Sequence, residues 1–562
     1  MKITWFLVAL FWIASDFGYC HEFAPSLLKI NELPQVTEER SRYSAVLKTP
    51  SRPDGLPMLT PEWPSSCETD RQTRVQAAGA TTVSNFLLSC RFANQSLSGE
   101  TIDVVSPIDG NHMTMIQRSR REDVDVAVNA AKLAFDDGRW SNQPPVDRKK
   151  VLIKWAELVE KEALSLAVLG VRENGTEINM ALKAEPFSAA ATLRYYGEAI
   201  DKVYGEIAPT AEGILGLIKK EPIGVVGAIV PWNFPLMIGA WKIGPALAAG
   251  NSVILKPAES ASLSLLRLAE LGLEAGLPPG VLQVVTGYGS EAGQAIALSK
   301  DVDVLTFTGA GPTGRKLMEF SAQSNLKRVY LELGGKSPNI VFSDAPDLEL
   351  AAKSAVNAIF RNSGQVCVAG SRLLVEHSIY QNFLDKVCNY TAKLKVGDPL
   401  DLSNDIGAVH SEAQLLKNLS FLDSLKNREK NIVLGGDRLI EESGGFYMSP
   451  TIVENINSKD EIFHEEIFGP VLSVIPFSKD EEAISIANDT SYGLAAGVWT
   501  SNLSRAHKMA NGIKSGMITV NTYAGTDMTV PLPGMKESGN GSDKSLHSLE
   551  KYTNLKTVWV NL

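Results

Sequence analysis

The sequence predicts an α/β protein with a parallel, doubly wound sheet followed by a second α/β domain. Between Gly224 and Gly334, five short β-branched, apolar runs each stop at Gly, Pro or Asn, and segments of helical length separate them. Parallel strands need such crossovers, which are normally helices. The expected strands lie in the stretches GVVGAIVPWNF, SVILKPAES, LQVVTGYG, VDVLTFTGAGPTG and RVYLELGG, and the expected helices cover residues 235–250, 261–276, 290–299 and 313–324. Ligands bind such sheets beyond the carboxyl ends of the strands, so the residues after each run are candidates for binding.

The composition excludes several classes of function. A chain of 562 residues is too long for one hydrophobic core, and 44% hydrophobic with 21% charged residues is typical of a globular protein. The net charge of -10, without a run of Lys or Arg, argues against nucleic acid as a partner. The five cysteines (Cys20, Cys67, Cys90, Cys367 and Cys388) lack the spacing of a disulfide framework or a zinc site. We therefore expect no metal centre.

The first 84 residues differ from the rest of the chain. Residues 1–20 hold Lys2 and an apolar run from Ile3 to Ala14, which is too short to cross a bilayer and is about the length of a signal-peptide core. Residues 21–84 are rich in proline and lack a lasting period, which predicts a linker or disordered extension. The leader has two interpretations, an artefact of start-site choice or a true export signal.

Globular order is expected from Asn85 onward. A strand is expected at 103–105, and helices at 122–134 and from Asp147 are expected to pack on the first sheet, in a domain of residues 85–334. Strands and helices continue to alternate after this domain, but with a different spacing. This predicts a second domain over residues 335–540, facing the first across a cleft. Its expected elements are strands at 339–342 and 372–375, helices at 348–361 and 379–394, and strands near Ile432, Thr451, Val471 and Met517.

Two strand ends offer competing dinucleotide sites. Gly309 to Gly314 reads GxGxxG, and Glu332 lies 18 residues further on, where an acid can hold a ribose. Lys256-Pro-Ala-Glu259 also ends a strand, and Glu259 could take the ribose hydroxyls instead while Lys256 steadies the same sugar. In that case Glu332 is free for another task.

Cys367 is the candidate nucleophile because of its setting. A lone cysteine is more often inert core, but Gly364-Gln365 before it and Ala369-Gly370 after it let the backbone approach a substrate in the expected cleft. A thiolate that attacks an aldehyde forms a tetrahedral oxyanion, which needs hydrogen-bond donors. The side-chain amide of Asn233, at the end of a strand, is a suitable donor.

Six motifs occur in an order and spacing that resemble one family. They are PWNFP (231–235), KPAE (256–259), FTG (307–309), LELGGKSP (331–338), GQVC (364–367) and EIFGP (466–470). Over roughly residues 85–562 the chain resembles the aldehyde dehydrogenase superfamily. Within it, DMTVP (527–531), SGNG (538–541) and DKSLH (543–547) look most like gamma-glutamyl-gamma-aminobutyraldehyde dehydrogenases. The resemblance implies a Rossmann-type domain, a second catalytic domain and a small oligomerisation element.

The resemblance also implies a reaction. Cys367 attacks the aldehyde, the Asn233 amide and the Cys367 backbone N–H hold the oxyanion, and hydride passes to NAD, leaving a thioester. Glu332 then acts as the base that activates water to hydrolyse the thioester to a carboxylate. The expected substrate is a small aldehyde, and an amino-aldehyde from polyamine breakdown, such as gamma-glutamyl-gamma-aminobutyraldehyde, is favoured. Betaine aldehyde, aliphatic aldehydes and broad specificity are alternatives. A coenzyme-A-acylating enzyme is disfavoured because Glu332 is present, and a cofactor-binding structural protein is the non-enzymatic alternative.

The resemblance assigns the cofactor site and the assembly. Lys256 and Glu259 are expected at the adenosine ribose, and Glu466 and Phe468 at the nicotinamide end. The full expected set is Trp232, Lys256, Glu259, Gly289, Gly293, Phe307, Thr308, Gly309, Ala310, Gly314, Leu333, Glu466 and Phe468. A carboxylate at position 259 repels a 2′-phosphate, so NAD is favoured, and NADP stays possible because of Lys256. A homodimer or homotetramer is expected, with residues 195–218 and a C-terminal oligomerisation strand, assigned to residues 541–562, crossing to the partner.

Some positions depart from the family pattern. Ala310 and Gly311-Pro312 replace polar residues near the cofactor, and residues 532–535 differ near the family's substrate entrance or its subunit contacts. Asp527 is a candidate to bind an ammonium head group. We expect a cytoplasmic protein without a membrane span, because an oxidising compartment threatens a free thiol and offers little nicotinamide cofactor. The secretory pathway is the alternative if the leader is a signal peptide.

Overall fold

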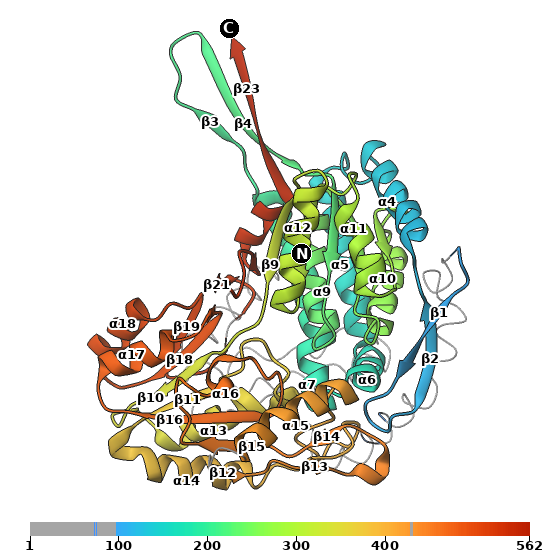
Figure 1. The fold of residues 1–562 in the computed structure, drawn as a ribbon. Helices are drawn as coiled ribbons and strands as arrows, with labels where there is room; N and C mark the ends of the chain where they lie inside the picture. The colour runs from blue at the N-terminus through green and yellow to red at the C-terminus, as the bar shows by residue number, and fades with distance from the viewer. Residues whose placement is uncertain (1–71, 73–74, 76–96, 427–430, 526) are drawn as a thin grey trace, which may run out of the picture. The chain divides into compact units, whose positions relative to one another are not determined.

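The computed structural model describes residues 72, 75, 97–426, 431–525 and 527–562 (Figure 1). The chain divides into two units, Met1–Glu68 and Thr69–Leu562, and every element below belongs to the second. The expected leader (1–20), nearly all of the expected linker (21–84), the start of order near Asn85, and Cys20, Cys67 and Cys90 lie outside the described residues.

The first sheet is five-stranded and wholly parallel. It consists of β5 (Val225–Ile229), β6 (Ser252–Lys256), β7 (Leu282–Val284), β8 (Val304–Thr308) and β9 (Arg328–Glu332), in the spatial order β7-β6-β5-β8-β9. Every residue of β5, β6 and β8 is buried, which explains their uninterrupted apolar runs. The chain moves outward from β5 to β7 and returns on the other side as β8. The crevice at the carboxyl ends of β5 and β8 is therefore a topological switch point.

Helices connect these strands and cover the sheet (Figure 1). The crossovers are α9 (Pro235–Ala248), α10 (Leu263–Ala275), η4 (Gly289–Gly293) with α11 (Gln294–Leu298), and α12 (Gly311–Gln323). The helix expected at 290–299 is thus a π-turn followed by one short α-helix. Before the sheet come β1 (Thr101–Val105), β2 (His112–Gln117), α4 (Arg121–Asp136), α5 (Pro145–Lys161), α6 (Ala163–Asn174), α7 (Ile178–Leu182), η2 (Lys183–Phe187), α8 (Ser188–Ala199) and η3 (Ile200–Lys202). Helix α4 buries the alanines and valines of its predicted face.

The second sheet has seven strands in the order β12-β15-β16-β11-β10-β18-β19, parallel except for the edge strand β12. The strands are β10 (Pro338–Val341), β11 (Arg372–Glu376), β12 (Asn431–Leu434), β15 (Thr451–Glu454), β16 (Val471–Phe477), β18 (Ala495–Trp499) and β19 (Met517–Val520). Its helices are α13 (Leu348–Phe360), α14 (Tyr380–Thr391), α15 (Glu412–Lys426), α16 (Glu461–His464), α17 (Asp480–Asn488) and α18 (Leu503–Gly512). The predicted fold class, two α/β sheets with helical crossovers, is confirmed.

Short strands and turns complete the second half of the chain. They are η5 (Arg361–Gly364), η6 (His377–Ile379), β13 (Arg438–Leu439), η7 (Glu441–Ser443), β14 (Tyr447–Met448), β17 (Tyr492–Gly493), β20 (Leu532–Pro533), β21 (Met535–Lys536) and β22 (Ser542–Asp543). Among the described residues, no helix is long and apolar enough to span a bilayer.

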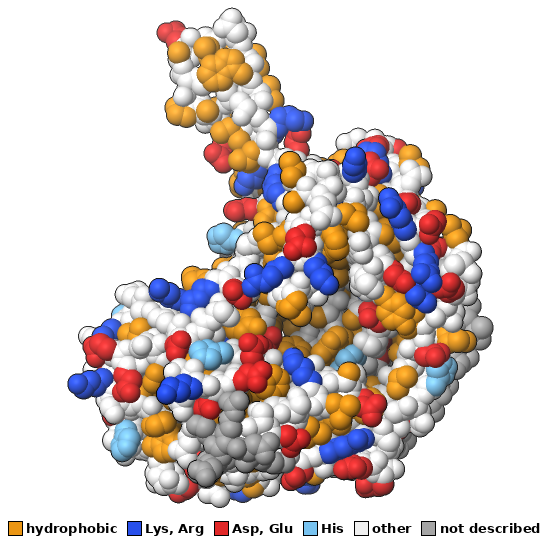
Figure 2. Space-filling view, viewed as in Figure 1, with side chains coloured by type: hydrophobic (Ala, Val, Ile, Leu, Met, Phe, Trp, Pro, Cys, Tyr) orange, Lys and Arg blue, Asp and Glu red, His pale blue; other side chains and the backbone are white. Residues whose placement is uncertain are grey.

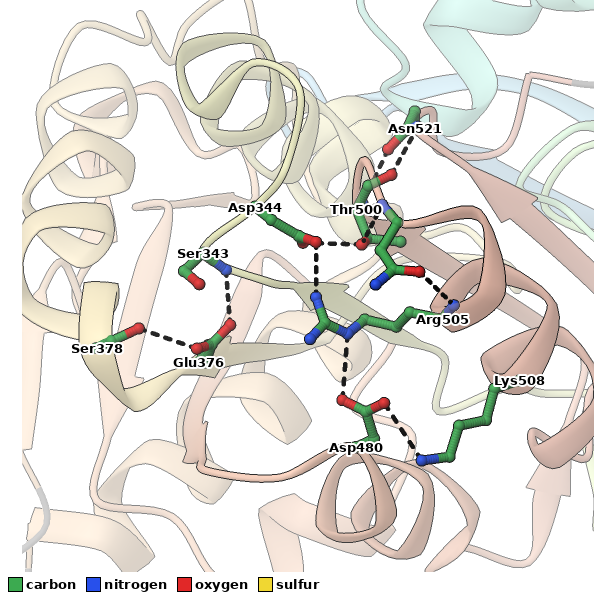
Figure 3. A network of polar contacts seen from close by, with 10 residues as sticks. Ser343, Asp344, Glu376, Ser378, Asp480, Thr500, Arg505, Lys508 and Asn521 are labelled. Atoms are coloured by element: carbon green, nitrogen blue, oxygen red, sulfur yellow. Dashed lines mark hydrogen bonds and ion pairs between the residues drawn. The ribbon is translucent and has the colours of Figure 1, made fainter.

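The carboxyl ends of the second sheet are closed by their own side chains (Figure 3). Arg505 donates to Asp344 at 2.7 Å and to Asp480 at 3.2 Å, and Thr500 donates to Asp344 at 2.8 Å. Asn521, after β19, accepts from the backbone N–H of Thr500 at 3.0 Å. This network occupies the edge where a parallel sheet usually binds ligands. The loop that carries Cys367 precedes β11 and therefore lies at the opposite, amino edge of the second sheet. The two sheets are directly linked there, because only five residues separate β9 of the first sheet from β10 of the second.

The C-terminal strand β23 (Thr553–Asn561) pairs within its own chain. It runs antiparallel to β4 (Ile214–Pro222), which also pairs with β3 (Glu206–Ala208), to form a three-stranded sheet (Figure 1). Residues 541–552 contain β22 and the 3-10 turn η8 (Leu546–Tyr552), which packs against α9. The final segment is therefore more than a strand, because its first half belongs to the core around α9.

A buried cation–anion–cation cluster holds this segment on α9. Lys242 and Lys551 each donate to Asp543 at 2.6 Å, one to each carboxylate oxygen, and all three side chains are at most 5% exposed. Removal of one partner from such a buried cluster leaves an uncompensated charge in a medium of low dielectric constant.

Replacement of Asp543 by Asn is expected to lower the free energy of unfolding by about 3–5 kcal/mol, because two buried ammonium groups lose their carboxylate. Denaturant unfolding measures this change. The control is Glu537→Gln, which breaks the exposed 2.9 Å ion pair with Arg315 and should cost about 1 kcal/mol or less. Equal losses in the two variants would contradict the importance of the cluster.

Candidate active site

A cavity of about 200 Å³ opens at the switch point of the first sheet, between the two sheets. Nine residues of the predicted site line it: Trp232, Asn233, Thr308, Gly309, Ala310, Leu333, Cys367, Glu466 and Phe468. Trp232 and Asn233 follow β5, and residues 308–310 end β8 and lead into α12. The structure therefore brings the candidate nucleophile, the candidate oxyanion donor and part of the expected cofactor set to one cavity.

The remaining predicted residues of the cofactor set do not line this cavity. Lys256 ends β6, donates to the Pro257 carbonyl at 2.8 Å and lies 3.5 Å from Glu259. Gly293 faces the Lys256 side chain, and Gly289 begins the same π-turn. The others pack inside the first domain: Phe307 has its ring against Gly309, and Gly314 lies against Leu333. A side chain at Gly309 would put Cβ 2.5 Å from that ring, so this close approach needs glycine.

Cys367 reaches the cavity through a strained turn between α13 and β11. Asn362 and Ser363 have φ values of +49° and +51°, in the left-handed region that non-glycine residues seldom adopt. Buried hydrogen bonds compensate for the strain. Thr176 Oγ1 donates to Asn362 Oδ1 at 2.7 Å, and Ser363 Oγ donates to the Gly407 carbonyl at 2.9 Å.

The Asn233 amide ties this turn to the first sheet. Its Nδ2 donates to the carbonyl oxygen of Gln365 at 2.9 Å, two residues before Cys367. The Asn233 carbonyl in turn accepts from Asn362 Nδ2 at 3.2 Å. An amide nitrogen carries two N–H groups, so the second remains for an anion in the cavity.

The charges around Cys367 keep its thiol protonated. Burial, and then the carboxylates of Glu466 and Glu332, raise its pKa to about 12. Burial also raises the pKa of Glu466 to about 7, although the Gly335 N–H, which donates to Oε1 at 2.9 Å, opposes this rise. A base is therefore needed before the thiol becomes a nucleophile.

Glu332 lies beneath the cavity and does not line it. Neither carboxylate oxygen has a hydrogen-bond partner among the described residues, and Oε1 lies 3.3 Å from the position of a Cβ on Gly541. Burial and the Asp543 carboxylate raise its pKa well above the usual range, against the lowering effect of Lys242 and Lys551. A buried acid with a raised pKa is a candidate to take up and release a proton during a reaction.

Sequence reasoning missed two polar wall residues, Gln414 and Lys417, from the first turns of α15; Pro231, Ile238 and Gly334 also line the cavity and were not in the predicted set. Gln414 Nε2 donates to the carbonyl of Ile467 at 2.9 Å and to that of Phe468 at 3.2 Å, which supports the Phe468 ring. The spacing of Gln414 and Lys417 on one helix face was the only local signal, and it does not distinguish them from surface residues.

Comparisons with known proteins match this arrangement. The model of the aldehyde dehydrogenase family matches residues 93–558. The chain belongs to this family. It is 47% identical, over 463 residues, to the NADP/NAD-dependent aldehyde dehydrogenase PuuC of Escherichia coli (strain K12). The matched residues make up 82% of this chain and 93% of that protein.

Two solved structures extend the comparison. Indole-3-acetaldehyde dehydrogenase in complex with NAD+ has a TM-score of 0.85 and 47% identity, over 88% of this chain and 99% of that chain. Gamma-glutamyl-gamma-aminobutyraldehyde dehydrogenase from Burkholderia cenocepacia J2315 has a TM-score of 0.84 and 45% identity, over 87% and 99%. The predicted family is confirmed, and the chain is an oxidoreductase of the aldehyde dehydrogenase type.

Replacement of Glu466 by Gln is expected to speed alkylation of Cys367 by iodoacetamide at pH 8, roughly three- to tenfold. A negative charge beside a thiol disfavours the thiolate, so its removal lowers the thiol pKa and raises the thiolate fraction. Peptide-resolved mass spectrometry measures the rate at Cys367 alone. Glu465→Gln, the same change at the exposed neighbouring residue, is the control and should leave the rate unaltered. A slower rate in Glu466→Gln would contradict the assigned direction.

Proposed function

We propose that this aldehyde dehydrogenase oxidises an amino-aldehyde to the carboxylate with NAD, through a covalent intermediate on Cys367. The convergence of Cys367 and Asn233 on one cavity at the switch point of a parallel sheet supports this most directly. The similar proteins named for NADP/NAD-dependent and gamma-glutamyl-gamma-aminobutyraldehyde oxidation support the substrate class and the cofactor.

The residues present fit a dinucleotide. Gly309 and Ala310 line the cavity at the N-terminus of α12, where backbone N–H groups favour phosphate. The Thr308 hydroxyl is buried with no hydrogen-bond partner among the described residues. At the end of β6, Lys256 and Glu259 present a cation and a carboxylate for ribose hydroxyls, which favours NAD and leaves NADP possible. When bound, the nicotinamide supplies the hydride acceptor.

For each step of the proposed aldehyde oxidation, a residue of this chain can carry out the required proton transfer, attack or stabilisation. The Cys367 thiol gives up its proton to a carboxylate, Glu332 or Glu466, and its sulfur adds to the aldehyde carbon. The second N–H of the Asn233 amide and the Cys367 backbone N–H hold the oxyanion. Loss of hydride leaves a thioester. The proton taken from the thiol passes to solvent, so Glu332 is free to act as a base. Glu332 turns toward the cavity and takes a proton from water, the resulting hydroxide adds to the thioester carbon, and the Cys367 thiolate leaves as the carboxylic acid forms. No hydrogen bond of the described residues holds Glu332 away from this position.

Cys367→Ala is expected to abolish NADH formation with an aldehyde, by about 10³-fold or more, and to leave the dissociation constant of NAD within about twofold. Absorbance of NADH and calorimetry measure the two quantities. The control is Cys388→Ala, at the half-buried cysteine of α14, which should retain the parent rate. Residual oxidation near the parent rate in Cys367→Ala would refute the assigned nucleophile.

Asp527 is the proposed contact for the substrate's ammonium group. Its side chain is exposed, and hydrogen bonds from Thr529, then the charge of Lys544, lower the pKa of the carboxyl, which stays ionised at neutral pH. The Lys544 ammonium lies 6.0 Å from the centre of the Trp241 ring. Trp241 packs on the same apolar cluster as Val368, the residue after Cys367. These contacts from Lys544 through Trp241 to Val368 support a substrate path between Asp527 and the thiol.

Asp527→Asn is expected to raise the Michaelis constant for amino-aldehydes about three- to tenfold, because an exposed charge pair contributes about 1 kcal/mol or less and a more enclosed one somewhat more. An aldehyde panel with NAD and NADP gives the constants. Uncharged aliphatic aldehydes of equal length are the control and should keep theirs. Equal changes for both substrate types would reject this contact.

We also propose a homodimer or homotetramer that forms through the three-stranded sheet β23-β4-β3. Large apolar side chains lie exposed on or beside it: Tyr204 (73%), Ile207 (73%), Leu555 (70%), Trp559 (61%) and Leu562 (81%). Figure 2 shows hydrophobic side chains on the projecting part of the molecule, which Figure 1 labels as β3, β4 and β23. Exposed apolar strands normally acquire a partner. A monomeric mass by light scattering would exclude this assembly.

A cytoplasmic location is proposed because the thiol must stay reduced, and cell fractionation tests it.

A further inference from the structure

His410 stands beside the cavity without lining it. Its ring stacks on the Trp232 ring with centroids 4.1 Å apart and planes 7° apart, and Trp232 meets Phe468 edge-on at 5.3 Å. Trp232 and Phe468 line the cavity, whereas His410 is 6% exposed and supports Trp232 from behind. A stacked ring can still rotate in its own plane, so a further contact is needed to fix its orientation.

The Ser260 hydroxyl supplies this contact. His410 Nε2 lies 2.7 Å from Ser260 Oγ, and Ser260 directly follows Glu259 in the turn after β6. Burial lowers the pKa of His410 to about 3, so the ring is neutral at neutral pH. Nδ1 has no hydrogen-bond partner among the described residues. The bond to Ser260 is therefore the polar contact that orients the ring.

The backbone of His410 reaches the turn that carries Cys367. Its N–H donates to Gln365 Oε1 at 2.8 Å, and Gln365 Nε2 donates to the Asn362 carbonyl at 3.1 Å. The Gln365 carbonyl is the group that accepts from the Asn233 amide. One residue thus contacts the turn after β6 through its side chain and the cysteine-bearing turn through its backbone.

We propose that His410 is a positioning residue that couples the turn after β6 to the turn of Cys367, so that a nucleotide held at Glu259 changes the reactivity of the thiol. This inference rests on the proposed NAD site. Coupling between two sites requires an element whose position both of them bias. The loop 407–411 is such an element, because it bonds to Ser260 on one side and to Gln365 on the other.

Two variants remove the same hydrogen bond from opposite ends. Ser260→Ala deletes the hydroxyl, and His410→Phe keeps a ring on Trp232 but has no nitrogen. The matched control is Ser262→Ala, two residues further along, where the hydroxyl is buried and has no hydrogen-bond partner among the described residues. All three variants are compared with the unaltered full chain.

Two quantities are measured in each protein: the dissociation constant of NAD, and the alkylation rate of Cys367 with and without saturating NAD. Ser260→Ala and His410→Phe are each expected to weaken NAD binding about three- to tenfold, the usual effect of losing one net hydrogen bond. In both, the ratio of alkylation rates with and without NAD should move toward one. Ser262→Ala should leave both quantities at the parent values.

The double variant Ser260→Ala/His410→Phe separates coupling from independent damage. If the two side chains act through one bond, its dissociation constant for NAD equals that of the weaker-binding single variant, rather than the product of the two effects. The inference would be overturned if the two single-variant effects on the dissociation constant of NAD multiplied in the double variant. It would also be overturned if Ser262→Ala had the same effect as Ser260→Ala. A third contrary result is an unchanged ratio of alkylation rates in variants whose melting temperature is lower. Failure of the unaltered chain to bind NAD would instead overturn the proposed function, and this inference with it.

Discussion

The hydrogen bond from the Asn233 amide to the Gln365 carbonyl joins the two sheets where the cavity opens. Asn233 follows β5 at the carboxyl edge of the first sheet, and Gln365 precedes β11 at the amino edge of the second. Neither edge forms the cavity alone. The left-handed residues Asn362 and Ser363 are tolerated because buried partners on both sides hold them. Backbone strain in this turn thus accompanies the placement of one sulfur atom against an amide donor.

The electrostatics of the site follow from burial. Burial, and then the carboxylates near Cys367, raise the pKa of its thiol, and a thiol with a raised pKa is a poor target for oxidants. The reactive form therefore depends on proton transfer to an acid whose own pKa is raised. Beneath the cavity, Lys242 and Lys551 neutralise Asp543 and leave one positive charge beside Glu332. The remaining positive charge stabilises Glu332, which is buried near the Cys367 thiol and has no hydrogen-bond partner among the described residues.

Prediction from the sequence worked where the signal is local. The strands β5, β6 and β8 are buried on both faces, so their residues are apolar without interruption and their ends are marked by Gly, Pro or Asn. It was less accurate at residues 290–299, where a π-turn replaces the first helical turn. It missed Gln414 and Lys417, and the structural role of His410, because their partners lie in other parts of the chain. His410 contacts Ser260, 150 residues away.

The sequence by itself determined the chemical groups of the site and the elements that carry them, because motifs such as PWNFP and GQVC combine a strand end or a turn with the reactive side chain. It also determined the family, since these motifs occur together in one order. Only the tertiary structure decided which groups meet: Asn233 with the Gln365 carbonyl, Glu332 with the Asp543 cluster rather than on the cavity wall, and β23 with β4. These contacts depend on the packing of distant segments, and the free energy of packing is summed over many residues that no single stretch of sequence contains.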